Sequence, residues 1–176
     1  KINLQTKKYL VLTLHRPSNV DSPKTLSKLL MTIVECSNGL PIVFPIHPRT
    51  KKNILGLQKK PRNLFLVDPQ PYLQFNFLVS NSKAVITDSG GITEEATVMG
   101  VPCMTMRSST ERVETITIGT NELIGSDISA LKFAMKKLFS GRWKKGNIPE
   151  KWDGKAGFRI IQILEKLLEF QNLRNK

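Results

Sequence analysis

Polar residues suited to binding an anion directly follow five short apolar segments of this sequence. Both histidines of the chain belong to this set, and each has an arginine within the next two positions. Arginine donates paired hydrogen bonds to phosphate or carboxylate oxygens, and histidine exchanges a proton near neutral pH. The five polar stretches begin at His15, His47, Asp68, Asp88 and Arg107. If the apolar segments are parallel strands of one sheet, these stretches share one edge of it and predict an anion site there.

The stretch over residues 88–95, with the sequence DSGGITEE, carries the clearest local signal. An apolar segment leads into Ser89, Gly90 and Gly91, and a helical pattern follows. Glycine lets the backbone approach a ligand closely or adopt a positive φ, and a helix start offers unpaired N–H groups with a partial positive charge. These features predict a cradle for a phosphate or diphosphate, although a plain tight turn fits them equally well. The stretch matches neither the G-x-G-x-x-G spacing of NAD-binding folds nor a P-loop.

Charged residues close to this stretch could hold the rest of a nucleotide. Glu94 and Glu95 stand in the first turn of the predicted helix, where acids complement the helix dipole, yet a carboxylate there could also bind ribose hydroxyls. Arg107 and Arg112 could clamp phosphate oxygens, with a surface ion pair between Glu111 and Arg112 as the alternative. The sequence contains no Ser-His-Asp order and no cluster of metal ligands, so these residues alone leave the reaction open.

The apolar periodicity alternates between short strands and amphipathic helices. Ser22 and Pro23 are typical of a helix N-cap and first helical position, and Gly39 is typical of a helix end. The pattern predicts strands over 9–14, 41–46, 64–67, 84–87, 102–106 and 122–124, and helices over 23–38, 51–58, 72–79, 92–99, 128–139 and 155–173. Repeated strand–helix–strand units predict an α/β fold with a doubly wound, Rossmann-like parallel sheet. The last helix has an apolar stripe, which we expect to cover this sheet.

Length and composition exclude several protein classes. The 176 residues are 40% hydrophobic and 23% charged, which predicts one globular domain over residues 1–176. No apolar run approaches the roughly 18–20 residues of a membrane span. Cys36 and Cys103 are far apart in sequence, so we expect reduced, buried thiols in a cytoplasmic protein, with no disulfide scaffold and no zinc module. The chain opens with Lys1 in place of Met, as an excised fragment would.

The formal net charge of +13 favours binding to anions. Basic residues concentrate in residues 49–62 and 132–159, but neither segment has the interleaved aromatic residues of a single-strand-binding surface. We therefore favour a solvated lysine face over nucleic-acid binding.

Many of these pieces, in order and spacing, resemble the C-terminal half of the non-hydrolysing UDP-N-acetylglucosamine 2-epimerases. The similarity runs from about Tyr9 to Leu168. It is carried by T-L-H-R with Asn19, I-H-P over 46–48, Tyr72-Leu73 with Phe75, T-D-S-G-G-I with E-E over 87–95, G-V-P over 100–102, and Arg107 followed by T-E-R over 110–112. Gly119-Thr120 and L-I-G over 123–125 continue it.

The resemblance implies one half of a glycosyltransferase-B type fold, in which this chain holds UDP and a missing N-terminal domain closes the substrate cleft. It implies elimination of UDP to a glycal and re-addition with inversion at C2, which interconverts UDP-N-acetylglucosamine and UDP-N-acetylmannosamine without a metal or redox cofactor. It also implies a homodimer for the full-length protein. Carried onto matching positions, the catalytic residue is His15, and the substrate-binding residues are Arg16, Gln70, Phe75, Ser89, Gly90, Gly91, Glu95 and Arg112.

The sequence departs from that family at four positions and in length. Pro17-Ser18 replaces the frequent R-E pattern before Asn19, Thr93 stands where Gln is frequent, and Val113 where Pro often follows T-E-R. The acids credited with moving the C2 proton belong largely to the absent half, so we expect this chain alone to be inactive. The alternatives are the nucleotide-binding half of a UDP-sugar glycosyltransferase or hydrolysing epimerase, and a non-catalytic basic binding module.

Overall fold

A computed structural model describes residues 2–54 and 61–174. Its six strands form one parallel sheet in the order β3-β2-β1-β4-β5-β6. This is the order of a doubly wound nucleotide-binding fold, so the predicted fold class is confirmed. The strands are β1 (Leu10–Thr13), β2 (Ile42–Pro45), β3 (Leu64–Val67), β4 (Ala84–Thr87), β5 (Cys103–Thr105) and β6 (Asn121–Leu123).

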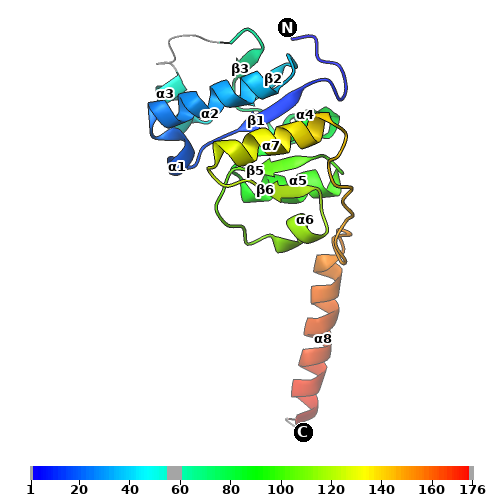
Figure 1. Cartoon of the computed structure of the whole chain (residues 1–176). Coiled ribbons are helices and arrows are strands. Elements are labelled where there is room, and N and C mark those ends of the chain that lie inside the picture. The colour runs from blue at the N-terminus through cyan, green and yellow to red at the C-terminus, as the bar shows by residue number, and fades with distance from the viewer. Residues whose placement is uncertain (1, 55–60, 175–176) are drawn as a thin grey trace.

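Helices cover both faces of the sheet, because alternate residues of each strand point to opposite sides. Leu10 and Leu12 of β1 pack in the core cluster that includes residues of α2 and α7, whereas Tyr9 and Val11 pack in the cluster that includes Val79 and Ala96. Figure 1 shows α2 and α7 side by side over one face of the sheet. The helices are α1 (Pro17–Val20), α2 (Pro23–Cys36), α3 (Pro48–Ile54), α4 (Tyr72–Asn81), α5 (Gly90–Val98), α6 (Val113–Thr117), α7 (Ile128–Phe139) and α8 (Ala156–Arg174).

The chain reverses its direction of winding between β1 and β4, the central pair of the sheet. These strands pair in register from Leu10 with Ala84 to Thr13 with Thr87, and the two threonine hydroxyls lie 2.7 Å apart. The loops that follow β1 and β4 leave the sheet on opposite sides of this point. A doubly wound sheet binds its ligands at such a crevice.

The structure differs from the sequence prediction at several helix boundaries. Ser22 does cap α2, since its hydroxyl accepts a hydrogen bond from the Thr25 N–H at 3.3 Å. Helix α3 begins at Pro48, three residues before the predicted start, and residues 55–58 of that predicted helix lie outside the described residues. Helices α1 and α6 were not predicted. Helix α5 begins at Gly90, which places both glycines inside its first turn.

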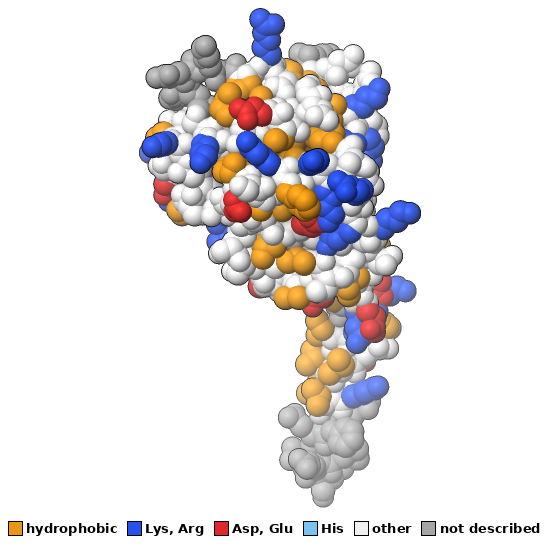
Figure 2. All heavy atoms as spheres, in the orientation of Figure 1, with side chains coloured by type: hydrophobic (Ala, Val, Ile, Leu, Met, Phe, Trp, Pro, Cys, Tyr) orange, Lys and Arg blue, Asp and Glu red, His pale blue; other side chains and the backbone are white. Residues whose placement is uncertain are grey.

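Helix α8 does not cover the sheet, so that expectation is wrong. It projects away from the rest of the chain, and hydrophobic side chains line one side of it (Figures 1 and 2). Seven large apolar side chains of its described part are 53–65% exposed, namely Phe158, Ile160, Ile161, Ile163, Leu164, Leu167 and Leu168. Helix α7 already occupies the place beside α2 where a further covering helix would pack. Across residues 2–54 and 61–174, no helix combines the length and apolar character needed to cross a membrane.

Candidate nucleotide-binding site

The carboxylate of Asp88, at the end of β4, organises the loop that follows β1. Asp88 is fully buried and accepts hydrogen bonds from the backbone N–H groups of His15 and Arg16, at 3.0 and 2.8 Å from Oδ2. The same oxygen accepts a bond from Nδ2 of buried Asn19 at 3.0 Å. One buried acid thus holds three backbone and side-chain donors from a segment about 70 residues away. These hydrogen bonds fix the loop after β1 over the switch point, the place between β1 and β4 where the sheet reverses its direction of winding.

Asp88 also orients the imidazole of His15. The Nδ1 atom of His15 lies 2.9 Å from Oδ1 of Asp88. The carboxylate thus faces the Nδ1 side of the ring, and Nε2 lies on the side away from Asp88. The His15 side chain is 36% exposed, and its ring centroid lies 5.5 Å from that of His47. The two histidines predicted at neighbouring strand ends are therefore brought together.

The start of α5 offers unpaired amide donors next to His15. The Ser89 side chain does not cap the helix, and the Ser89 N–H bonds instead to the Thr87 hydroxyl at 3.0 Å. The N–H groups of Gly90, Gly91 and Ile92 donate no hydrogen bond to any residue that the structure describes. Unpaired amides at the positive end of a helix are well suited to bind a phosphate.

Space, and not backbone conformation, explains the two glycines. Neither glycine has a positive φ, so the alternative of a tight turn requiring that conformation does not apply. A Cβ built on Gly91 would meet no atom within 4 Å, whereas one on Gly90 would lie 3.2 Å from Nη1 of Arg107. The Gly91 surface is therefore open to a ligand, and Gly90 gives Arg107 room to pack against the helix start.

A cavity of about 280 Å³ connects these groups with the ends of β2 and β3. His15, Ser89, Gln70 and Phe75, all predicted site residues, line it. Phe75, Ile92 and three prolines give it apolar walls, which suit a flat nucleobase. Gln70 stands at the end of β3, where its Nε2 donates to the Asp68 carbonyl at 2.7 Å.

Glu95 lies one helical turn beyond Gly91, on the same side of α5. It does not line the cavity, but Tyr72 at the start of α4 donates a hydrogen bond to it. Burial raises the pKa of the Glu95 carboxyl above its usual range, the Tyr72 bond lowers it in part, and the neighbouring charge of Glu94 raises it further.

Arg112 is held by Glu94 and not by Glu111. The Nε atom of Arg112 lies 2.8 Å from Oε1 of Glu94, so the alternative considered for Arg112, a surface ion pair with Glu111, does not apply. Glu111 instead pairs with Arg107, whose Nη2 lies 3.0 Å from Oε2 of Glu111. The Arg112–Glu94 pair joins the segment after β5 to α5, whereas the Arg107–Glu111 pair lies within that segment. Arg112 stays 44% exposed at the side chain.

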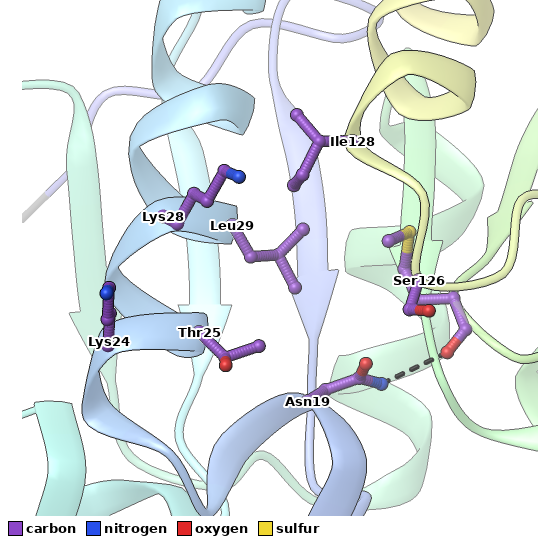
Figure 3. Close-up of a pocket in the computed structure, with 8 residues that line it drawn as sticks. Asn19, Lys24, Thr25, Lys28, Leu29, Ser126 and Ile128 are labelled. Atoms are coloured by element: carbon purple, nitrogen blue, oxygen red, sulfur yellow. Dashed lines mark hydrogen bonds between the residues drawn. The ribbon is translucent and has the colours of Figure 1, made fainter.

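A second cavity, of about 260 Å³, lies between α2 and the start of α7 (Figure 3). Its walls are Leu29, Met106 and Ile128, with Lys24 and Lys28 on α2. Asn19 forms its floor and donates a hydrogen bond to the Met106 carbonyl at 3.0 Å. None of the predicted site residues lines it. We therefore assign the nucleotide to the cavity beside His15.

The thiols and the basic segments contribute little to this site. Burial raises the pKa of the Cys103 thiol to about 12, which keeps it protonated and unreactive at neutral pH. In the basic segments, Arg49 pairs with Asp21 at 2.8 Å and Lys137 pairs with Glu122. Two of the basic side chains in these segments are thus paired with acids of the same chain. The described residues contain no group of three His, Cys, Asp or Glu side chains that could hold a metal ion.

Sequence reasoning located the segments of the site but missed the role of Asp88 and Asn19. Both lie within the polar stretches that follow the first and fourth predicted strands. Their role, however, comes from their burial and from hydrogen bonds between residues 69–73 positions apart in sequence. A charged residue directly after the short strand Ala84–Thr87, which is apolar except for its last residue, was the available signal.

Nearly the whole chain is similar in sequence to known proteins. Residues 1–165 match the sequence profile of a family described as UDP-N-acetylglucosamine 2-epimerase. An enzyme of that name from Methanocaldococcus jannaschii is 38% identical over 167 residues, which cover 89% of this chain and 44% of that protein. A Pseudomonas aeruginosa relative, UDP-2,3-diacetamido-2,3-dideoxy-D-glucuronate 2-epimerase, is 41% identical over 162 residues, or 90% of this chain and 45% of the relative.

The fold agrees with this match. A crystal structure of the M. jannaschii UDP-GlcNAc 2-epimerase in complex with UDP-GlcNAc and UDP superposes with a TM-score of 0.78 and 36% identity, over 92% of this chain and 46% of that one. The chain thus spans less than half the length of these relatives. On the profile, the identities and the superposition together, the chain belongs to the UDP-N-acetylglucosamine 2-epimerase family.

Proposed function

We propose that this chain binds the UDP portion of a UDP-activated 2-acetamido sugar, as the nucleotide-binding half of a 2-epimerase. The observation that carries the proposal is the convergence of three features at the switch point: the free amides of α5, the imidazole of His15, and the cavity toward Gln70 and Phe75. The family supports UDP-N-acetylglucosamine as the first substrate to test.

The ligand lies along the edge of the sheet. Phe75 and Gln70 border the uracil at the β3 end, and Glu95 binds the ribose hydroxyls. The diphosphate lies on Ser89, Gly90 and Gly91, with the exposed guanidinium of Arg112 nearby. Ionised Glu95 accepts hydrogen bonds from both hydroxyls, and a bound ribose would replace the water that its charge otherwise requires.

His15 is the catalytic residue of this half. Elimination removes the C2 proton, breaks the bond between C1 and the diphosphate oxygen, and gives a glycal and UDP. In its imidazolium form, His15 donates the Nε2 proton in a hydrogen bond to the departing diphosphate oxygen, while the Asp88 carboxylate faces Nδ1 and balances the positive charge of the ring. Re-addition returns UDP to C1 and a proton to the opposite face of C2. The groups that move that proton belong to a second half of the protein.

Two observations support a missing second half. The chain covers less than half of its relatives, and α8 exposes an apolar stripe with no surface to cover it among the described residues. The proposed N-terminal domain would complete the sugar side of the cleft.

Isothermal titration calorimetry of the 176-residue chain with UDP tests the proposal. We expect weak, single-site binding that His15→Ala reduces, and no conversion of UDP-N-acetylglucosamine by this chain. Thr117→Ala, in α6 and away from the cavity, is the matched control and should bind UDP as the parent does. Folded protein that releases no heat at millimolar UDP would contradict the proposal. Product analysis with the complete protein would separate a 2-epimerase from a glycosyltransferase or hydrolysing epimerase of the same fold.

A further inference from the structure

Helices α2 and α7, which lie side by side over one face of the sheet, carry an excess of lysine (Figure 1). Residues 23–36 and 128–139, all of which the structure describes, contain five lysines and one acid, Glu35. Four of the lysines are exposed, namely Lys24, Lys28, Lys132 and Lys136. Together with the exposed apolar residues Met31 and Phe133 they define the α2/α7 face. Figure 2 shows basic and hydrophobic side chains interspersed on the side of the molecule where these helices lie.

The four exposed lysines of the α2/α7 face are not used in ion pairs. None of them pairs with an acid in the part of the chain that the structure describes. The fifth lysine of the two helices, Lys137, does pair with Glu122 of β6. The α2/α7 face therefore keeps its positive charge, in a chain whose formal net charge is +13, and attracts a negatively charged surface.

The apolar side chains of this face are placed among the lysines. Phe133 is 68% exposed, and it follows Lys132 and precedes Lys136 by three residues, so all three project from one side of α7. Met31 is 39% exposed and lies three residues after Lys28 on α2. Transfer of an exposed phenyl ring from water to an apolar environment is favourable. The face thus combines a charge for an anion with a ring for an apolar phase.

Two cavities lie along the line where α2 and α7 meet, about 260 Å³ near the helix starts and about 360 Å³ near the helix ends. Each combines two lysines with apolar walls. The first is lined by Lys24, Lys28, Leu29 and Ile128, and the second by Lys132, Lys136, Met135 and Phe139. Figure 3 shows Lys28 of the first cavity extending from α2 toward Ile128 at the start of α7. Such hollows suit a phosphate between ammonium groups with hydrocarbon beside it.

We propose that the α2/α7 face binds the surface of a bilayer rich in anionic phospholipid. The lysines pair with lipid phosphates, while Phe133 and Met31 reach the boundary between headgroups and acyl chains. Each lysine near an anionic leaflet strengthens binding roughly fivefold. Attachment of this kind needs no membrane-spanning helix. The nucleotide cavity lies at the carboxyl edge of the sheet and shares no lining residue with this face, so UDP can bind while the protein is on the membrane.

A nucleic acid would account for the lysines but not for the apolar residues. Proteins that bind single strands stack successive bases on several aromatic side chains. Phe133 is the one exposed aromatic side chain on these two fully described helices. Phosphate contacts alone would leave both Phe133 and Met31 in water. The combination of the two residue types therefore favours a lipid surface.

Co-sedimentation of the full 176-residue chain with lipid vesicles tests the proposal. Vesicles of equal parts phosphatidylglycerol and phosphatidylcholine should bind the chain, and vesicles of phosphatidylcholine alone should not. Lys132→Gln combined with Lys136→Gln should weaken binding about tenfold or more. The matched control is Lys155→Gln combined with Lys166→Gln, an equal charge change at exposed positions before and within α8, and should leave binding nearly unchanged. An equal loss in both double variants would mean that only net charge matters, which overturns the proposal.

Phe133→Ser distinguishes a bilayer from other anionic partners. It should weaken vesicle binding about tenfold through the lost burial of the ring. If Phe133→Ser binds vesicles as the parent does, and a single-stranded oligonucleotide binds through Lys132 and Lys136, the face recognises a phosphate backbone and the proposal is wrong.

Leu164→Glu tests the rival surface, the apolar stripe of α8, and should bind vesicles as the parent does. Loss of binding in this variant would assign the membrane contact to α8 and overturn the inference. All the substituted side chains are exposed, so circular dichroism should show the parent fold in every variant. The measurement does not involve UDP, and its result is therefore independent of the proposed function.

Discussion

Asp88 shows how one buried carboxylate can support a binding site without facing the ligand. Its oxygens accept hydrogen bonds from two backbone N–H groups and from Asn19, Oδ1 lies 2.9 Å from Nδ1 of His15, and the side chain is buried from solvent. A buried charge is stable only when such donors compensate the loss of water. The same bonds fix the His15 ring and the backbone of Arg16, so stability and function depend on one residue here.

We expect Asp88→Asn to lower both stability and UDP affinity. An amide keeps the shape of the carboxylate, but its NH2 group must face one of the donors that Asp88 accepts from. The free energy of unfolding should fall by about 1–3 kcal/mol, which urea denaturation would measure. UDP binding should weaken in calorimetry because His15 loses its orienting partner. Asp68→Asn, at the exposed end of β3, is the matched control. Parent-like stability and affinity for Asp88→Asn would show that the carboxylate charge is dispensable.

The histidines, the arginines and the paired glycines could be identified from sequence, because their types and their places after apolar segments are visible there. The partners of these residues could not. Arg112 pairs with Glu94 and not with its neighbour Glu111, and His15 lies against Asp88. Both contacts depend on how separate loops pack together. The use of Gly90 is likewise set by Arg107, which packs against it from the end of β5.

Among the helices and strands, α5 matters most for binding, because its first turn presents the free amides. Its first turn contains two glycines, which are poor helix formers, so sequence periodicity placed the start two residues too late. Strands β1, β2, β4 and β5 were predicted because strands buried on both faces read as continuous apolar runs. The edge strand β6 has the sequence Asn-Glu-Leu, and the apolar pattern placed it one residue too late. The short helices α1 and α6 have only four and five residues, too few for a helical period to be visible.

Gly91→Ala should separate stability from binding. The structure leaves 4 Å of open space around an added Cβ, and alanine is the better helix former, so stability should be unchanged or rise by up to about 1 kcal/mol. The methyl group would occupy the space above the free amides, and UDP affinity should fall about tenfold or more through lost charge-assisted hydrogen bonds.

Thermal denaturation and calorimetry would measure these two effects. Gly157→Ala in α8 is the matched control, because its added Cβ also meets no atom within 4 Å and it lies far from the cavity. If Gly91→Ala binds UDP as tightly as the parent, the diphosphate does not lie on this turn.

At the scale of the whole molecule, both faces of the sheet are covered, but one helix keeps an exposed apolar stripe. Two core clusters fill both faces of the sheet, and α2, α4, α5 and α7 contribute to them. Up to Leu168, where its described side chains end, helix α8 adds nothing to either cluster, and its large apolar side chains there are more than half exposed. A stripe of this kind on an isolated helix marks a surface for another chain or domain. The sequence predicted the stripe, but not its direction, because periodicity does not say which surface a helix faces.

We expect the exposed stripe to make this chain self-associate, because pairing two such helices would bury apolar surface that water now contacts. Sedimentation or light scattering should show a mass that rises with protein concentration. Leu164→Glu places a charge in the middle of the stripe and should keep the chain monomeric, whereas Gln162→Glu adds the same charge to α8 outside the stripe and should not. UDP affinity should be the same in both variants, since α8 lies away from the cavity. If Leu164→Glu associates as the parent does, another surface drives the association. The stripe would then no longer support the proposal that α8 contacts a missing N-terminal domain.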